Sequence, residues 1–340
     1  MDYDVKTVFL KNENEKNELK SFLKRYDLNF EDNIDYSCII KDEKDRMIAT
    51  ASKTKNIIKC LAIDIGYRGL GISTVLINNI IDKIFKEGYS HFFAFTLNKN
   101  SQVFESLGFS KIINTNSVSL FENGAYNIMS YLDSLIEKHS FSNNEKSALV
   151  MNCNPMTLGH LHLIDYACKN SREVLLFVVE ENKSVFPFKD RLSIIKENTK
   201  DFKNLKIIES SDYIISLATF PSYFLKRLDD KIDIYTEMDL NIFGKYFCKK
   251  FNINKRYVGN EPFDQVTNKY NIAMKKILPE YGASVCEIER LELYGEVVSA
   301  SKVRNLIFEN KLIEAYKYLP QGTIDYLKSD NGKKIIDKIR

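Results

Sequence analysis

The spacing of hydrophobic residues changes near residue 150 of this 340-residue chain. Beyond that point, short runs that are apolar at nearly every position alternate with longer segments in which apolar residues recur every three or four positions. The first pattern predicts strands buried on both faces, and the second predicts amphipathic helices. Their alternation favours a parallel, doubly wound α/β sheet of the Rossmann-like kind. The predicted strands are 148–151, 174–180, 205–209, 232–236, 256–258 and 285–288, and the predicted helices are 161–169, 189–199, 220–228, 242–251 and 266–278.

The first part of the chain follows a different pattern, in which strands are clustered and helices are fewer. Two short apolar runs, 38–40 and 47–52, flank a charged turn and predict a β-hairpin. This arrangement is typical of an α+β domain. The other elements expected here are strands at 5–10, 57–63 and 92–96 and helices at 13–26 and 71–87.

A polar stretch rich in serine and asparagine separates the two patterns and predicts a linker over residues 138–147. A chain of this length is also too long for one ordinary hydrophobic core. We therefore expect an N-terminal α+β domain over 1–137 and a parallel α/β domain over 148–340.

Composition narrows the range of partners. The 49 basic and 46 acidic residues are interspersed and give a net charge of +3, so neither nucleic acid nor an anionic membrane is an expected partner. No apolar run reaches the length that spans a bilayer. The six cysteines are scattered through mostly apolar segments without metal-ligand spacing, which is typical of a reducing compartment. These features predict a cytoplasmic protein without a protein-bound metal site.

The first candidate for chemistry follows the first strand of the parallel pattern. Asn154 opens a turn, and Thr157, Gly159 and His160 form a Thr-x-Gly-His sequence at the start of the next predicted helix. A glycine permits close approach of backbone to a ligand, and a helix N-terminus offers free N–H groups to an anion. An imidazole fixed at that position can donate a hydrogen bond to a phosphate.

A second candidate lies far downstream, where Ser299 and Ser301 begin a predicted helix and Arg304 follows one turn later. Serine caps helix N-termini well, and the arginine can reach back to the same anion. Together the two sequences resemble the T/HxGH and ISxSxxR signatures of the nucleotidyltransferase superfamily. The resemblance implies catalytic roles for His160, Thr157 and Arg304 at the phosphates of ATP. It also implies nucleotide contacts from Asn154, Gly159, Ser299 and Ser301, with Mg²⁺ carried mainly by the phosphates and water.

Longer strings between these motifs narrow the resemblance to the citrate lyase ligase family; they are residues 177–191, 211–216, 218–226, 236–239 and 258–263. This resemblance implies that acetate is activated with ATP as acetyl-AMP. The acetyl group then passes to the thiol of a dephospho-CoA-type arm on the acyl carrier (gamma) subunit of citrate lyase. Lys183 and Arg191 are candidates to hold a carboxylate or the phosphates of the arm. Glu261 and Asp239 are candidates to orient ribose hydroxyls or a metal-bound water. For Asp239, a role as a helix cap is an equally good explanation.

In the first domain, Arg68, Gly69 and Gly71 precede the predicted helix 71–87 and form a candidate anion nest. This loop resembles the pyrophosphate loop of GNAT acetyltransferases and implies a CoA-type ligand. Phe104 stands where many of these enzymes have a tyrosine acid, so acetyl transfer by this domain is not expected. Two alternative functions stay open at this point. One is an adenylyltransferase acting on phosphopantetheine or nicotinamide mononucleotide, and the other is an acetyl-CoA-binding regulatory protein.

Overall fold

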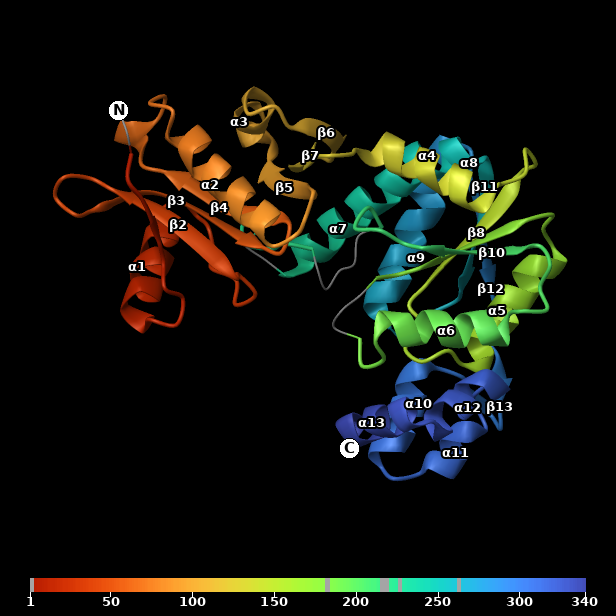
Figure 1. The fold of residues 1–340 in the computed structure, drawn as a ribbon. Coiled ribbons are helices and arrows are strands. Elements are labelled where there is room, and N and C mark those ends of the chain that lie inside the picture. The colour runs from red at the N-terminus through yellow and green to blue at the C-terminus, as the bar shows by residue number, and fades with distance from the viewer. Residues whose placement is uncertain (1–2, 181–183, 215–219, 226–227, 262–263) are drawn as a thin grey trace. The chain divides into compact units, whose positions relative to one another are not determined.

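The computed structural model describes residues 3–180, 184–214, 220–225, 228–261 and 264–340 (Figure 1). The chain folds into two compact units. The N-terminal unit holds residues 1–131 together with 220–238, and the C-terminal unit holds 132–219 and 239–340. This division differs from the predicted one, because the first unit ends before the polar stretch 138–147 and recovers a segment from the second half of the chain.

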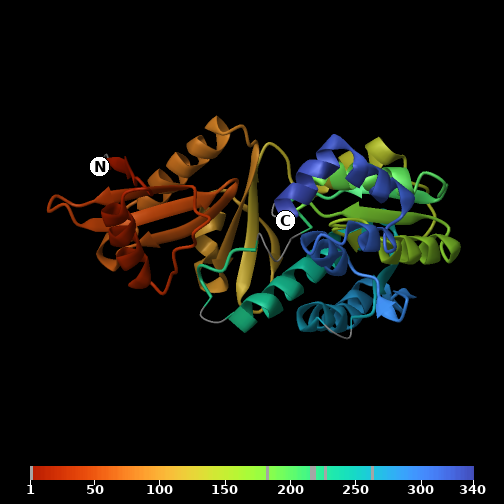
Figure 2. The same ribbon diagram turned by 90° about the horizontal axis from the view of Figure 1, so that it is seen from below.

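The N-terminal unit is built on a seven-stranded sheet in the order β1-β2-β3-β4-β5-β7-β6. Its pairs are antiparallel except for β4 with β5, which run parallel. Helices α1 and α2 lie on opposite faces of the sheet (Figures 1 and 2). The elements of this unit are β1 (Val5–Thr7), α1 (Glu13–Lys24), β2 (Tyr36–Lys41), β3 (Met47–Thr54), β4 (Ile57–Ile63), η1 (Ile65–Tyr67), α2 (Ile72–Lys86), β5 (His91–Leu97), η2 (Asn98–Asn100), α3 (Ser101–Ser106), β6 (Ser110–Asn114) and β7 (Val118–Gly124).

The predicted hairpin and the helix before β5 are confirmed. Ile72, Leu76, Ile80 and Ile84 recur every four residues on α2 and are all buried. They pack with the sheet residues of the same hydrophobic cluster, so the apolar stripe of α2 attaches the helix to the sheet.

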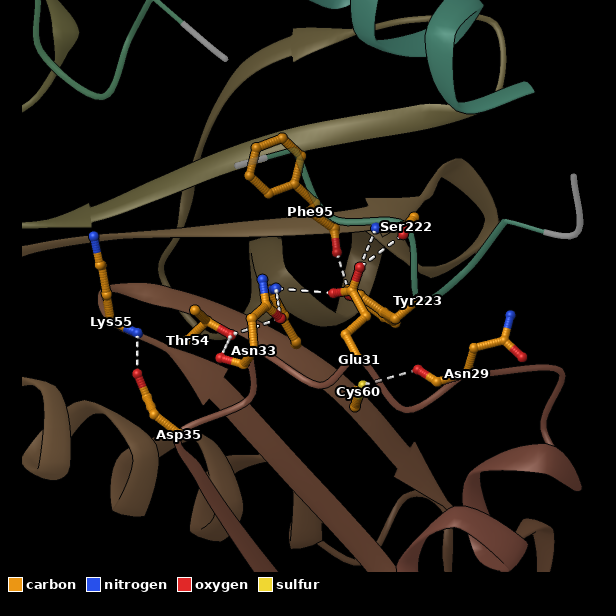
Figure 3. Close-up of polar contacts among 11 residues, drawn as sticks. Asn29, Glu31, Asn33, Asp35, Thr54, Lys55, Cys60, Phe95, Ser222 and Tyr223 are labelled. Atoms are coloured by element: carbon orange, nitrogen blue, oxygen red, sulfur yellow. Dashed lines mark hydrogen bonds and ion pairs between the residues drawn. The ribbon is translucent and has the colours of Figure 1, made fainter. Parts of the chain in front are cut away.

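The segment 220–225 belongs to this unit although it follows the C-terminal unit's third strand in sequence (Figure 3). Ser222 donates hydrogen bonds to the half-buried Glu31 carboxylate from its backbone N–H at 2.7 Å and from its hydroxyl at 2.8 Å. The Tyr223 hydroxyl donates to the carbonyl oxygen of Phe95 at 2.6 Å. The predicted helix 220–228 is therefore wrong over the described residues 220–225, where the polar groups bind other parts of the unit instead of forming helical turns.

The C-terminal unit contains a five-stranded parallel sheet in the order β10-β9-β8-β11-β12, as the alternating pattern predicts. Leu176 and Val178 join the cluster formed with α5 and α6, whereas Phe177 packs against Phe243 and Phe247 of η3. Alternate side chains of one strand thus serve two covered faces. The first elements are β8 (Lys146–Met151), α5 (Leu158–Lys169), β9 (Val174–Val178), α6 (Phe188–Asn198), β10 (Leu205–Glu209), β11 (Ile253–Gly259), α9 (Gln265–Ile277) and β12 (Ser284–Ile288).

The remaining elements are α4 (Ile128–His139), α7 (Leu228–Ile242), the π-helical η3 (Phe243–Cys248), α8 (Lys249–Phe251), η4 (Leu278–Tyr281), β13 (Glu292–Leu293), β14 (Glu296–Val297), α10 (Ala300–Phe308), α11 (Leu312–Tyr316), α12 (Gln321–Lys328) and α13 (Asp330–Ile339). They include η3 and α8, which together form the predicted helix 242–251. Helices α10 to α13 follow one another at the C-terminus (Figure 1).

The predicted strand 232–236 is wrong, because these residues form part of α7. Local β-branched and aromatic residues favoured a strand. However, the buried positions Thr236, Leu240, Phe243 and Phe247 are spaced three or four residues apart, which is the period of a helix. Packing of this longer stripe decides the structure. Asp239 consequently lies within a helix and not at the end of a strand.

Candidate nucleotide-binding site

The turn after β8 leads into α5, whose N-cap residue is Thr157. The backbone N–H of Thr157 donates to Nδ1 of His160 at 3.0 Å, and the Thr157 hydroxyl lies 2.8 Å from the same nitrogen. Threonine and histidine thus cap the helix reciprocally, as serine and glutamate do in an ordinary capping box. Because Nδ1 accepts a hydrogen bond, the neutral ring carries its proton on Nε2.

The imidazole of His160 is held in its neutral form. Burial, together with the nearby positive charge of Arg290, lowers the pKa of His160 to about 4. At neutral pH the ring therefore presents an Nε2–H donor without a full positive charge. Such a donor can bind a phosphate oxygen without becoming a permanent ion-pair partner of it.

The second motif lies at the start of α10, where the Ser299 hydroxyl caps the helix by accepting from the backbone N–H of Lys302 at 3.1 Å. Arg304 lies one turn into this helix. Its guanidinium donates to the Ser301 hydroxyl at 3.1 Å and to the carbonyl oxygen of Asn154. The second motif is thereby bonded to the turn that precedes the first one.

The two motifs also approach each other at Gly159. A Cβ atom at this position would lie 3.0 Å from the carbonyl oxygen of Val298, the residue before Ser299. Only glycine accepts this approach without displacing the neighbouring loop. The N-termini of α5 and α10 are therefore neighbours, and the positive ends of two helix dipoles lie close together.

A cavity of about 820 Å³ opens at this place within the C-terminal unit. Thr157, Gly159 and His160 line it from one motif, and Ser299 and Ser301 line it from the other. A volume of this size is ordinary for a nucleotide-sized ligand. The predicted site residues named so far converge on this cavity, except that Asn154 and Arg304 bind each other and are not among the described residues that line it.

Glu261 lies just beyond the end of β11 and also lines the cavity. Its carboxylate forms an ion pair with Arg290 and accepts from the backbone N–H of Asp264 at 3.2 Å. Arg290 donates in addition to the carbonyl oxygen of Asn260 at 2.7 Å. Sequence reasoning missed Arg290. The available signal was its place two residues after β12, at the same edge of the sheet as the other site residues.

Arg191 differs from the expectation for a substrate-binding residue. Its side chain on α6 is fully buried. The guanidinium donates to the carbonyl oxygens of Phe186 at 3.1 Å, Asn152 at 2.6 Å and Val179 at 3.0 Å. It therefore fixes the loops that follow β8 and β9, and it is not among the described residues that line the cavity. Lys183, predicted beside it, lies outside the described residues.

In the N-terminal unit, the predicted anion nest lies between η1 and α2. Gly69 and Gly71 have φ angles of +78° and +77°, and Gly71 is the N-cap residue of α2. A Cβ atom would meet nothing within 4 Å at either position, so backbone conformation and not space favours glycine there. Arg68 is exposed and donates to the carbonyl oxygen of Ile63 at 3.2 Å.

Comparison with known proteins gives the C-terminal unit a family. The sequence profile of the citrate lyase ligase C-terminal domain matches residues 146–327. A protein named [citrate [pro-3S]-lyase] ligase from Escherichia coli K12 is 36% identical over 96% of this chain and 94% of its own length. The chain belongs to the citrate lyase ligase family. The protein of the same name from Haemophilus influenzae is 34% identical over 91% of this chain and 94% of its own length.

The match to the citrate lyase ligase family begins with β8 and ends in α12, so it contains both predicted phosphate motifs. A solved acetyltransferase of the GNAT family from Staphylococcus aureus covers 36% of this chain and 99% of its own chain, at 14% identity and a TM-score of 0.31.

Two further findings concern the described part of the chain. None of its helices is both long and apolar enough to cross a lipid bilayer. No group of three or more histidine, cysteine, aspartate or glutamate side chains among these residues is arranged to hold a metal ion.

Proposed function

We propose that this chain is a cytoplasmic ATP-dependent acid–thiol ligase that acetylates the acyl carrier subunit of citrate lyase. Acetate is first activated as acetyl-AMP, and the acetyl group then passes to the thiol of the dephospho-CoA-type arm on that subunit. The names of the relatives supply the ligase activity and citrate lyase as the protein acted on. The observation that carries the nucleotide step is the convergence of both motifs on one cavity.

The first step needs charge stabilisation and positioning more than covalent chemistry from the protein. An oxygen of acetate attacks the α-phosphorus of ATP, an O–P bond forms, and the bond from that phosphorus to the β-bridging oxygen breaks. Pyrophosphate leaves with the electron pair. The Nε2–H of neutral His160 and the N-termini of α5 and α10 are suited to bind the α-phosphate and the departing pyrophosphate.

The second step uses the mixed anhydride made in the first. The thiolate of the carrier arm attacks the acetyl carbon, a C–S bond forms, and the bond between that carbon and the AMP oxygen breaks. AMP leaves with the electron pair, and the thiol proton passes to the solvent. The leaving phosphate is the α-phosphate that His160 would have held in the first step.

Magnesium enters this proposal as part of the substrate. Glu261, a carboxylate that lines the cavity, is paired with Arg290, and the described residues offer no cluster of carboxylates. The N–H and hydroxyl groups of the two motifs fit phosphate oxygens. The ion would therefore be held by the phosphates and water, and it would neutralise part of their charge.

The N-terminal unit is proposed to bind the CoA-derived end of the carrier arm. The left-handed backbone at Gly69 and Gly71 and the start of α2 form a concave set of N–H groups suited to a pyrophosphate. Phe104 is buried at 4% exposure, and its ring has no proton to give. The unit is accordingly proposed as a binding module without acetyl transfer of its own.

The test is to incubate the purified chain with ATP, Mg²⁺ and acetate and to measure pyrophosphate. We expect release that depends on acetate, and mass spectrometry should find the acetyl group on the arm of an added citrate lyase carrier subunit. Release that depends instead on phosphopantetheine or nicotinamide mononucleotide would contradict the proposal and favour an adenylyltransferase.

A further inference from the structure

Arg256 is a buried cation on the wall of the nucleotide cavity that the steps above do not use. It lies on β11, its side chain is 4% exposed, and it lines the cavity. One terminal nitrogen donates to the Tyr270 hydroxyl at 3.3 Å. Its Nε and Nη1 atoms have no hydrogen-bond partner among the described residues. Buried guanidinium donors are ordinarily paired, since an unpaired one loses its hydration without replacement.

The surroundings hold the guanidinium in a fixed position. Its central carbon lies 4.5 Å from the centre of the Phe243 ring and 5.8 Å from that of the Tyr270 ring. The Tyr270 hydroxyl in turn donates to the carboxylate of Asp239. Two aromatic rings and one relayed carboxylate therefore orient the cation, and Nε and Nη1 stay buried without a partner among the described residues. This is a preorganised donor set, and the group cannot lose its charge by titration in the accessible pH range.

The position of Arg256 on β11 favours contact with a small anion over contact with the triphosphate. Arg256 precedes Gly259, the last residue of β11, by three positions, so it lies deeper than the helix N-termini at the strand ends. Met274, buried at 1% exposure, lines the cavity on the same side as Tyr270, four residues along α9. A charged donor set beside an aromatic ring and a thioether fits a carboxylate that carries a short apolar group.

We infer that Arg256 binds the carboxylate of the acid that is activated, so that Tyr270 and Met274 form the wall that admits a short side chain. The inference rests on the proposed function, because it assigns the acid subsite of that reaction. Arg256 is then a binding residue that holds the attacking oxygen near the nucleotide, and Tyr270 and Asp239 are positioning residues that act through it.

The first experiment measures KM for acetate and for ATP from pyrophosphate release in three proteins: the unaltered chain, Arg256→Lys and Lys255→Gln. Lys255 is the matched control, because neighbouring strand residues point to opposite faces and its ammonium lies over the Tyr257 ring at 5.6 Å. We expect Arg256→Lys to raise KM for acetate about tenfold or more and to change KM for ATP less than about twofold. Lys255→Gln should change neither. An unchanged KM for acetate, or an equal rise in both constants, overturns the inference.

A second experiment does not depend on turnover. Saturation-transfer NMR on the methyl protons of acetate, with α,β-methylene-ATP bound, should show contact in the unaltered chain and in Lys255→Gln but not in Arg256→Gln. If acetate contacts the protein but no acetate-dependent pyrophosphate is released, the proposed reaction is contradicted and the acid subsite is still supported. No contact in the unaltered chain, or equal contact in the Arg256→Gln variant, overturns the subsite even where pyrophosphate is released.

Discussion

At the start of α5, three neighbouring residues combine a helix cap, a close backbone approach and a candidate hydrogen-bond donor to a phosphate. Thr157 supplies the cap, Gly159 permits the approach of the Val298 carbonyl, and His160 returns the cap through Nδ1. The cap fixes the tautomer of the imidazole, and Arg290 helps to keep the ring neutral. Side chains that are explained locally by helix capping are therefore also oriented for the proposed contact with a phosphate.

The protonation of His160 gives a prediction that NMR can check. The folded pKa of about 4 lies below the ordinary value of about 6.5. Acid therefore favours the unfolded state, and the stability contributed by His160 is lost as pH falls from about 6.5 to about 4. The Cε1–H signal of His160, assigned by its absence in His160→Gln, should titrate near pH 4. Arg290→Gln should raise this midpoint, and a midpoint near 6.5 in the unaltered chain would contradict the assignment.

Removal of the donor should affect the rate more than substrate binding. We expect His160→Ala to lower kcat for acetate-dependent pyrophosphate release by about 10²–10³-fold, since a single preorganised donor to the transition state has that effect. Lys169→Ala is the control, because it lies on the same helix but not among the residues that line the cavity, and its pair with Asp165 is exposed. Equal activity of His160→Ala and the unaltered chain would exclude the catalytic role.

Gly159→Ala should disturb the contact between the two motifs. The added methyl group would lie 3.0 Å from the Val298 carbonyl oxygen, so the loop before Ser299 must move. Overpacking of this kind costs about 1–3 kcal/mol, and we expect KM for ATP to rise by roughly 5- to 100-fold. Gly66→Ala is the matched control, since a Cβ there meets nothing within 4 Å. An unchanged KM for ATP would show that the approach is not needed.

At the scale of elements, the segment 220–225 replaces an expected helix by side-chain attachment to the N-terminal unit. Glu31 is the centre of this attachment, since it accepts two hydrogen bonds from Ser222 and pairs with the buried Lys59 at 2.8 Å. Burial raises the pKa of the Glu31 carboxyl, but the Lys59 charge and the bonds from Lys59 and Ser222 outweigh it and leave the pKa below its ordinary value.

This carboxylate should make the N-terminal unit sensitive to acid. Because the folded pKa of Glu31 is lowered, its contribution to stability is present above the ordinary pKa of about 4.3 and is lost as pH falls through the folded value. Glu31→Gln leaves Lys59 buried without its ion pair and should destabilise the unit by about 3–5 kcal/mol at neutral pH.

Calorimetric melting between neutral pH and about pH 3 measures both effects. The Glu31→Gln variant should melt at a lower temperature and lose less stability on acidification than the unaltered chain. Glu105→Gln is the control, since its pair with Lys111 is exposed and should contribute less than about 1 kcal/mol. Equal melting of the Glu31 and Glu105 variants would contradict the structural role of the attachment.

The elements that could be predicted from sequence are those whose signal is local. Continuous apolar runs correctly predicted the five strands of the parallel sheet, because strands buried on both faces need apolar residues at every position. The predicted strand 232–236 is not part of that sheet. The prediction at 232–236 was wrong because the buried residues that continue its helical spacing, Phe243 and Phe247, lie about two and three turns further along the chain. The two phosphate motifs were recognisable because helix caps and glycines have fixed spacing.

Residues that act through distant partners could not be recognised in the same way. Arg191 resembles a substrate-binding arginine in sequence, yet it binds three backbone carbonyls. Arg256 lies on a strand and Arg290 just after one, and neither belongs to a motif. Their contacts are made with Tyr270 and Glu261, which lie in other parts of the chain. Spacing along the chain carries no information about such contacts.

At the scale of the whole molecule, the N-terminal unit is discontinuous in sequence, because it needs 220–238 as well as 1–131. A fragment of residues 1–137 should therefore be less stable than the same unit in the intact chain, since Glu31 and the Phe95 carbonyl lose Ser222 and Tyr223. A synthetic peptide of residues 220–238 added to the fragment should raise its melting temperature. A fragment that melts like the intact unit and ignores the peptide would contradict this prediction.

The discontinuity also sets an order for folding during synthesis. A ribosome delivers residues 1–131 first, but the segment that binds Glu31 and Phe95 leaves the exit tunnel only after the first three strands of the parallel sheet. The C-terminal unit in turn waits for β11 and β12, which follow that segment. The N-terminal unit therefore stays incomplete until residue 238 has been translated, and a gene split near residue 140 would leave the first product without the segment that binds Glu31 and Phe95.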